Sequence, residues 1–448
     1  MAGSPDIAPA KPPFRRFWFV DLAPGVTHFN MWVFLYASYA TIGLLTFIAV
    51  GTPYVLSAHL GIPLAEQGRV TGDLTFWNEI ALLAVFGPVG VLADRIGRRE
   101  VFALGLLIMG IAYGLYPFAS SLGELTAYRM IYAVGIAAAT GMLGTLIADY
   151  PQSQSRGKIV ALGGTLNGLG VVSVTVGLGG MMKAFVSGGA DAETAGEYAH
   201  LIVAALCIFS AIIIQIGVRP GTPVAREERP PVGELIRSAF LEARNPRIAL
   251  AYACAFVARA DLVILGTFSI LWGAKVAQES GLDAASGVAA GRLTFGMASV
   301  AALLWLPLMG FVLDRINRVT GTAICMTLTS LGFLSTLLMD NPIAPESRVL
   351  WALVGIGNIS AFAAATTLVS AEAPTAKRGV VVGMFNMMGV IGILISSGIG
   401  GRLFDSVSPA APFVLIGGLS ALVVVFALVV RVIAPGPMNT GGGFMGGH

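Results

Sequence analysis

Charged side chains are scarce in this sequence. Asp, Glu, Lys and Arg make up only 11% of its 448 residues, whereas soluble domains carry roughly 25% charged residues. Hydrophobic residues make up 56%, so polar side chains cannot cover the surface of a soluble globule. The composition excludes an ordinary soluble protein and predicts a chain that is solvated by lipid. The net charge of +3 then reflects membrane topology, and no nucleic-acid partner is expected.

Cysteine and histidine are nearly absent as well. The three cysteines each lie inside an apolar run, and an odd number of buried thiols predicts no disulfide framework. The four histidines are isolated along the sequence, so none has the spacing of a metal-ligand pair. A phosphate-binding loop that ends in Gly-Lys-Ser or Gly-Lys-Thr is missing, which argues against transport driven by ATP. No catalytic constellation stands out, so we expect no enzyme activity, no metal and no organic cofactor.

Long apolar runs are what the chain has in abundance. Twelve runs approach the ~20 residues that an α-helix needs to cross the hydrocarbon core of a membrane. The sequence therefore predicts an all-α integral membrane protein whose twelve transmembrane helices form two six-helix halves. The runs lie at residues 31–55, 75–93, 101–119, 125–148, 159–185, 201–218, 248–272, 293–313, 321–339, 349–370, 380–403 and 412–433.

A polar stretch at residues 219–247 divides the two sets of six runs. It predicts a cytoplasmic linker between an N-terminal half at 31–218 and a C-terminal half at 248–434. Residues 1–30 are expected to form a cytoplasmic lead-in, and the Gly-rich residues 435–448 a flexible tail. Most of the 27 Lys and Arg residues flank one side of the predicted helices, and this side is expected to be cytoplasmic. We therefore expect a monomer in a bacterial inner membrane with both termini in the cytoplasm.

Two loops about half a chain apart share a pattern of glycine and charged residues. Subtracting 94 from 314 gives an offset of 220 between their aspartates. A second pattern, an acidic residue followed by an arginine, repeats after the fourth and tenth runs. Ordinary positive-inside loops would explain the arginines but not the fixed spacing of glycine and aspartate. The two patterns comprise Gly90, Asp94, Arg95, Gly97, Arg98, Arg99, Asp149 and Arg156 in the first half, and Gly310, Asp314, Arg315, Arg318, Glu372 and Arg378 in the second.

This duplicated arrangement resembles the major facilitator superfamily of secondary transporters over nearly the whole chain. The resemblance implies that the first loop latches the two halves together on the cytoplasmic side. Asp94 would then lie near the start of the eleventh helix, at residues 379–382, where the positive end of a helix attracts a carboxylate. Arg95 or Arg98 would pair with Asp149.

Three further residues sharpen the comparison with this family. Gly90 would let a neighbouring helix approach, as small residues do in lipid. The second copy of the loop has Asn317 where the first has Gly97, which predicts a weaker latch. Arg129, in the fourth predicted helix, resembles an arginine of proton-coupled members of the family.

Three charged residues, Glu79, Arg259 and Asp261, lie within apolar runs and have no charged counterpart in the other half. An ionised group at the centre of a membrane helix costs at least ~2.5 to 3.5 kcal/mol, so function is the default interpretation. Glu79 or Asp261 is the candidate for a protonatable coupling group. Arg259 is the candidate for a gate partner of Glu79 or for an anchor of an anionic solute. Because Arg259 and Asp261 lie ~200° apart on a regular helix, they cannot both face one cavity.

Five polar or aromatic residues within the runs are candidates to line a substrate cavity. Packing or interfacial anchoring is the alternative for the tyrosines. The two asparagines recur at an offset of 219, so a symmetric hydrogen-bonding role is the alternative for them. The five residues are Tyr36, Tyr39, Asn167, Tyr252 and Asn386.

These features favour a secondary active transporter that moves a small polar or anionic organic solute by alternating access. A proton gradient is the expected energy source, and the solute and the lipid bilayer are the expected partners. Two alternatives stay open. One is an exporter of amphipathic drugs or lipids, and the other is a membrane receptor or assembly factor that kept the fold but does not transport.

Overall fold

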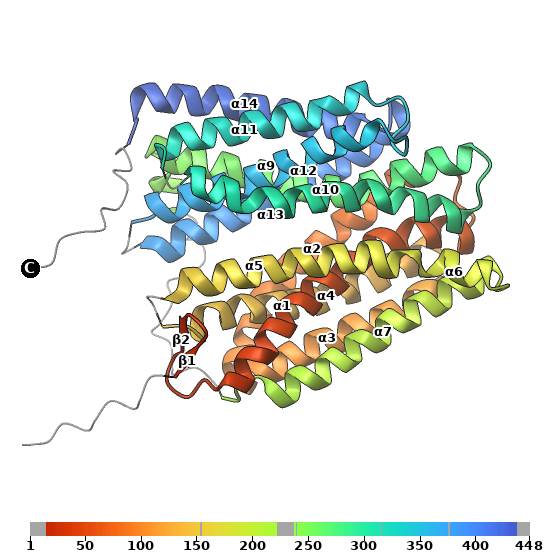
Figure 1. The fold of residues 1–448 in the computed structure, drawn as a ribbon, viewed down its shortest axis with the longest axis horizontal. Coiled ribbons are helices and arrows are strands. Elements are labelled where there is room, and N and C mark those ends of the chain that lie inside the picture. The colour runs from red at the N-terminus through yellow and green to blue at the C-terminus, as the bar shows by residue number, and fades with distance from the viewer. Residues whose placement is uncertain are drawn as a thin grey trace, which may run out of the picture.

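The structure is a computed structural model of the chain. It describes residues 15–152, 155–221, 237–238, 240–313, 315–374 and 377–436. Within these ranges, twelve helices are long and apolar enough to cross a membrane. This number confirms the prediction, and the protein is an integral membrane protein of two six-helix halves, which lie one above the other in Figure 1.

The N-terminal half contains the first six spans. Two of them are extended by turns that are not α-helical: α1 continues into a π-helix, and α5 continues through η4 and η5 into the short helix α6. The elements are α1 (His28–Tyr54), η1 (Val55–His59), α2 (Gln67–Ile96), α3 (Arg98–Leu115), η2 (Tyr116–Phe118), α4 (Leu122–Asp149), α5 (Arg156–Val172), η4 (Ser173–Gly177), η5 (Leu178–Gly180), α6 (Met181–Ser187) and α7 (Ala192–Gly217).

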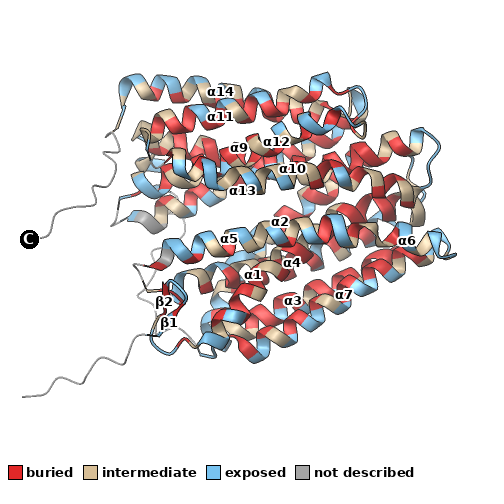
Figure 2. Cartoon of the chain, viewed as in Figure 1, coloured by how far each residue is buried: buried red, intermediate tan, exposed pale blue. Residues whose placement is uncertain are grey.

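The C-terminal half repeats the arrangement with six further spans. Its first helix α9, like α1 in the other half, has the largest share of buried residues, as the red ribbons of Figure 2 indicate. The elements are α9 (Pro246–Glu279), α10 (Ala284–Leu313), α11 (Arg318–Leu334), η6 (Ser335–Leu338), α12 (Ser347–Glu372), α13 (Arg378–Ser406) and α14 (Ala411–Ile433).

Polar residues begin several of the helices. Thr27 and Asn30 form a capping box at the start of α1. The side chain of Asp191 accepts from Thr194 N at the start of α7, and that of Asn245 accepts from Arg247 N at the start of α9. Such caps stabilise a helix by ~1 kcal/mol each because they satisfy N–H groups that have no partner within the helix.

The residues before α1 contain more structure than the predicted lead-in. Strands β1 (Arg16–Phe17) and β2 (Val20–Asp21) form an antiparallel hairpin. Leu22 then forms a bridge with Pro151, and Asp21 N donates to Ser155 Oγ over 3.0 Å. From residue 15 onward, the segment predicted as a cytoplasmic lead-in thus contains a hairpin and is joined to the loop between α4 and α5. Residues 1–14 lie outside the described ranges.

The bundle has two ends, which we call the terminal face and the distal face. The terminal face carries the β1–β2 hairpin and the end of α14, and the distal face is opposite (Figure 1). At the distal face the halves are in contact. A Cβ atom at Gly72 of α2 would lie 2.5 Å from the carbonyl oxygen of Ser397 and 3.0 Å from Gly401 Cα of α13, so the two backbones nearly touch.

Toward the terminal face the halves diverge (Figure 1). Apart from the glycine's own helix, no atom of the described residues lies within 4 Å of the position that a Cβ would take at Gly90 of α2, Gly310 of α10 or Gly383 of α13. The close helix approach expected at Gly90 is therefore not made in this conformation. It is made at the other end of the same helix, at Gly72, because the structure is closed at its distal face.

Candidate functional site

Glu79 and Arg129 lie in the interior of the N-terminal half, where each is 8% exposed. Glu79 Oε1 accepts from Asn78 Nδ2 over 3.1 Å. Arg129 and Arg259, the latter from the other half, both act electrostatically on the Glu79 carboxylate. Among the described residues, however, no ion pair within 4 Å joins Glu79 to either arginine. The structure thus brings the expected gate partners near each other without direct contact.

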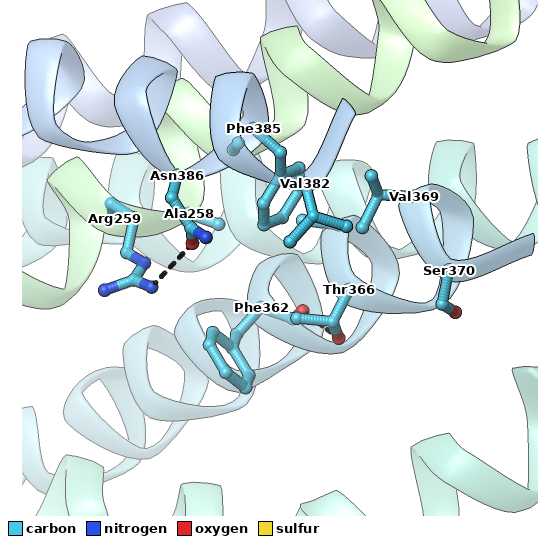
Figure 3. A pocket seen from close by; sticks show the side chains of 11 residues that line it. Ala258, Arg259, Phe362, Thr366, Val369, Ser370, Val382, Phe385 and Asn386 are labelled. Atoms are coloured by element: carbon cyan, nitrogen blue, oxygen red, sulfur yellow. Dashed lines mark hydrogen bonds between the residues drawn. The ribbon is translucent and has the colours of Figure 1, made fainter. Parts of the chain in front are cut away.

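Arg259 lines a cavity of about 420 Å³ on the inner side of the C-terminal half, shown in Figure 3. Its guanidinium is exposed to this cavity, and its Nη2 donates to Asn386 Oδ1 over a long 3.4 Å. Arg259 and Asn386 are the strongly polar residues of a lining that is otherwise apolar or hydroxylic. The lining residues are Ala255, Ala258 and Arg259 of α9, Phe362, Ala365, Thr366, Val369 and Ser370 of α12, and Val382, Phe385 and Asn386 of α13.

Gly389 sets the position of the Arg259 side chain. A Cβ atom at Gly389, one turn beyond Asn386 on α13, would lie 2.5 Å from Arg259 Cγ. The stem of the arginine therefore packs directly against the α13 backbone, and any larger residue at 389 would push the guanidinium away from Asn386. This close packing fixes where the positive charge lies in the cavity.

Asp261 faces away from the cavity. It is fully buried, and Asn358 Nδ2 of α12 donates to its Oδ1 over 2.9 Å. Its Oδ2 has no hydrogen-bond partner among the described residues. Arg259 and Asp261 thus face different surroundings, in agreement with the angle of ~200° between them. Of the two carboxylates singled out as coupling candidates, Glu79 is the one that interacts with Arg259.

Asn386 is the one cavity candidate that the structure places in this lining. Tyr36 OH instead bonds Ser210 Oγ of α7 over 2.8 Å, and Tyr252 is buried. Asn167 donates to the carbonyls of Gly163 and Ser38 when its amide is oriented to satisfy both. Tyr39, half-buried on α1, is not part of the lining either. None of these four residues belongs to the lining of the cavity at Arg259, and their place in a substrate cavity stays a prediction.

The two repeated asparagines have different partners. Asn167 joins α5 to Ser38 on α1, whereas Asn386 joins α13 to Arg259 on α9. Each therefore links the fifth helix of its half to the first. The partner of Asn386 is a charged side chain, whereas the partner of Asn167 on α1 is a backbone carbonyl.

The latch residues of the first half lie at the terminal face. Arg98 and Asp149 form an ion pair that joins α3 to the end of α4, and Arg99 binds Glu100 over 2.8 Å. Asp94 and Arg95 are exposed at the end of α2. The role of Asp94 at the start of α13 stays a prediction.

The turn between α2 and α3 explains how the second copy departs from the first. Gly97 has φ +109°, a conformation that favours glycine. Asn317 instead has φ −55°, and its side chain accepts from Val319 N and Thr320 N at the start of α11. The second loop therefore has an asparagine cap at the position where the first loop has a glycine turn.

The remaining latch residues of the second half make contacts inside that half. Glu372 binds Arg247 over 3.1 Å, and the Arg315 guanidinium stacks on the Phe311 ring. Arg318 begins α11 and is half-buried. Asp314 lies outside the described residues, as do the side chains of Arg156 and Arg378.

Sequence reasoning missed the wall that α12 contributes to the cavity. Phe362 and Thr366 follow one another at helical spacing, and Phe385 precedes Asn386 on α13. Phenylalanines inside a membrane span are indistinguishable from packing residues in a sequence. Gly389 carried the only usable signal, because it lies three residues after a polar residue of a span and so shares its helix face.

Comparison with known proteins agrees with this architecture. The family model described as Major Facilitator Superfamily matches residues 33–396 and, in an overlapping second match, residues 267–444. The solved structure of the nucleoside transporter NupG superposes with a TM-score of 0.69 at 16% identity, over 90% of this chain and 99% of that one. At that identity the likeness concerns the fold alone.

Several curated relatives are similar in sequence. Magnetosome protein MamH of Paramagnetospirillum magneticum is 27% identical over 395 residues, which are 86% of this chain and 88% of that protein. Magnetosome protein MamZ of the same organism is 26% identical over 91% of this chain, but the match spans only 63% of MamZ. Niacin transporter NiaP of Acinetobacter baylyi is 40% identical over 91 residues, 20% of each chain. With the family match, the twelve spans and the shared fold, the chain belongs to the Major Facilitator Superfamily and is a transporter, not an enzyme.

Proposed function

We propose that this transporter moves a small organic anion with an apolar, ring-sized body, and that a proton gradient drives the movement. The observation that carries the proposal is Arg259, whose guanidinium faces a cavity with a mostly hydrocarbon wall. A site of this composition favours a ligand that is charged at one end and apolar over the rest.

The charged end of the proposed solute is inferred from the hydrogen-bond donors of Arg259. A guanidinium presents five N–H donors in a planar fork that matches a carboxylate. Here the Arg259 guanidinium donates one long hydrogen bond to the neutral amide of Asn386. No carboxylate of the described residues lies within 4 Å of it, so most of its donors are available to a solute. Paired N–H···O bonds to an anion are about twice as strong as neutral ones.

The apolar body of the proposed solute is inferred from the residues that line the cavity. The rings of Phe362 and Phe385, with aliphatic side chains between them, border a space of about 420 Å³. This volume lies in the range of roughly 300 to 1,000 Å³ that is typical of small-molecule sites. Niacin, the solute of the niacin transporter NiaP, is a pyridine carboxylate and so has both a charged end and an apolar ring. It is therefore the first solute to test.

Coupling to protons is proposed through Glu79. Because Glu79 and Arg259 act on each other electrostatically, the carboxylate and an anionic solute compete for the same positive charge. Protonation of Glu79 removes the competitor and favours the bound solute. Loss of the proton favours release.

The movement itself is proposed to be alternating access. In this proposal, the contacts at the distal face and the divergence at the terminal face belong to one of two end states. The second state would close the terminal face, with Asp94 at the start of α13. We place the terminal face in the cytoplasm and the protein, as a monomer, in a bacterial inner membrane, on the basis of the Lys and Arg distribution.

A binding experiment tests the proposal. Niacin and nicotinamide share a ring and differ in charge, so the pair isolates the contribution of the anion. We expect niacin, but not nicotinamide, to raise the unfolding temperature of the purified protein in a concentration-dependent way. Arg259→Gln should abolish the shift, and Arg259→Lys should retain part of it. Arg348→Gln is the matched control, because Arg348 is an exposed arginine of α12 outside the cavity.

Equal stabilisation by both compounds, or an unchanged niacin effect in Arg259→Gln, would contradict an anion site at Arg259. Stabilisation by amphipathic cations or lipids, with no effect of small anions, would favour the exporter. A panel of organic anions without any response, together with no transport in proteoliposomes, would favour a receptor or assembly factor.

A further inference from the structure

Two histidines lie together at the distal end of the N-terminal half. His59 ends the π-helix η1 that follows α1, and His200 lies on α7. Each ring rests on a glycine of the other helix. A Cβ at Gly51 would lie 2.5 Å from His200 Nε2, and a Cβ at Gly196 would clash with His59 Nε2. The two histidines are 141 positions apart in the sequence, so their proximity could not be expected from it.

His200 presents a buried acceptor atom that has no partner among the described residues. It is fully buried, and its Nδ1 lies 2.8 Å from the carbonyl oxygen of Gly196. A carbonyl only accepts, so Nδ1 carries the hydrogen and Nε2 carries a lone pair. That Nε2 atom is buried without a partner. Leaving such a group unpaired costs ~1 to 3 kcal/mol, and natural proteins seldom retain one without a use.

His59 connects His200 with the distal surface. It is half-buried, its Nε2 is also without a partner, and the two imidazoles act on each other electrostatically. Asp191, Glu193 and Glu197 at the start of α7 act on His59 in the same way. The pKa of the Asp191 carboxyl lies below its ordinary value because the backbone N–H and the hydroxyl of Thr194 donate to it. This acidic rim attracts cations, including protons, to His59.

The path continues from His200 toward Glu79. The Tyr116 ring stacks on His200 with a centroid distance of 5.9 Å, and Tyr116 OH bonds Thr52 Oγ1 over 3.0 Å. Thr52 and Arg129 both line a small cavity of about 20 Å³. This is enough for one water molecule, which needs about 10 to 15 Å³ measured in this way.

The small cavity also contains polar groups that lack partners. Thr71 Oγ1 and the Nε and Nη1 atoms of Arg129 are buried there without a hydrogen bond in the described structure. Arg129 in turn acts electrostatically on Glu79. These polar groups lie between the distal rim and the Glu79 carboxylate.

We propose that His59 and His200 form a proton-binding site through which protons reach Glu79 from the distal face. A proton is taken up on His59 Nε2 and passes to His200 Nε2. It then moves along the hydroxyls of Tyr116 and Thr52 and the small cavity to the Glu79 carboxylate. Each imidazole returns to its neutral form, so one proton is transferred and no other group changes. The groups that face the pair are Asp191, Glu193, Glu197 and Tyr54 at His59, and Tyr116 and Phe47 at His200.

This inference rests on the proposed proton coupling, so the test measures coupling and solute exchange separately. Proteoliposomes with a pH-sensitive dye inside report protons that move with niacin, and counterflow without a gradient reports exchange alone. Glutamine keeps a polar side chain of similar size but takes up no proton. His200→Gln is expected to lower niacin-driven proton movement by roughly 10-fold or more, as the loss of a proton-transfer group does, and to leave counterflow within about 2-fold of the parent. His28→Gln, exposed at the terminal face, is the matched control.

His59→Gln is the second test, and it decides the matter if His200→Gln does not fold. It is expected to reduce proton movement in the same way. Normal proton movement in whichever folded histidine variant is measured, alongside its loss in Glu79→Gln, would overturn the histidine site and leave the proton coupling intact. If the parent protein exchanges niacin by counterflow but moves no protons, the coupling and this inference both fail while the anion site stands.

Discussion

Replacing Asp405 by asparagine is expected to weaken the closed distal face. Asp405, at the end of α13, accepts from Gly68 N over 3.0 Å and from Arg69 N over 2.6 Å. These two N–H groups lie in the first turn of α2, so a carboxylate of one half binds the positive end of a helix of the other half. Asparagine would lose the charge and one of the two acceptors.

The magnitude follows from the geometry. A charge at a helix N-terminus contributes ~0.3 to 1 kcal/mol when exposed and up to ~2 when partly buried. Asp405 is half-buried, so we expect a loss of ~1 to 2 kcal/mol from the distal-closed state. This corresponds to a ~5- to 30-fold rise in the population that is open at the distal face.

Asp73→Asn is the matched control at the same seam. Asp73 binds Arg402 over 3.0 Å, also across the halves, but the two side chains are 43% and 58% exposed. An exposed ion pair contributes only ~0 to 1 kcal/mol. The control should therefore change the population by less than about 5-fold.

The assay is the labelling rate of a single cysteine by a membrane-impermeant maleimide. The three native cysteines are buried and free, so they can be replaced by alanine in the background. A reporter at Ser397, which is 1% exposed against α2, is accessible from the distal side only when the halves part. Labelling in Asp405→Asn no faster than in Asp73→Asn would refute the reasoning.

Three other predictions concern the residues singled out from the sequence. Asp94→Asn should weaken the terminal-closed state by ~0.3 to 2 kcal/mol, and an unchanged cysteine accessibility on both faces would remove its latch role. Glu79→Gln should abolish gradient-driven accumulation but keep counterflow. Asp261→Asn should keep both, because Asp261 is buried away from the cavity. Accumulation by Glu79→Gln at the parental level would exclude coupling through Glu79. In a double-mutant cycle on the unfolding temperature of the purified protein, Glu79→Gln and Arg259→Gln together should cost less than the sum of the single changes, because a lone buried charge is penalised. Strictly additive losses would show that the two residues do not interact.

The twelve spans could be predicted from the sequence because the length of an apolar run is a local property that the thickness of the bilayer fixes. The repeat at residues 94 and 314 likewise located the two halves. The β1–β2 hairpin was not predictable, since strands of two residues carry no periodicity and depend on distant contacts such as Asp21 with Ser155. The π-helical and 3₁₀ turns after α5 were missed although Gly177, Gly179 and Gly180 weaken the α-helix there.

The charged and polar residues of the candidate site could be predicted from the sequence, but the apolar residues that line its cavity could not. Glu79, Arg259 and Asn386 stand out because polar groups are costly in lipid. The partners of each group depend on how helices of one half pack, which a single sequence does not contain. Gly90 shows a further limit, because the sequence does not say at which end α2 touches α13, and in the structure the contact is at Gly72.

The most direct test of the whole account is niacin uptake by proteoliposomes under an imposed proton gradient, with and without a protonophore. The account predicts that the parent protein accumulates niacin above its equilibrium level and that collapse of the gradient returns it to equilibrium. Arg259→Gln should show neither accumulation nor counterflow, because both require the solute to bind at Arg259. Uptake that the protonophore leaves unchanged, or accumulation by Arg259→Gln at the parental level, would contradict a proton-driven organic-anion transporter centred on Arg259.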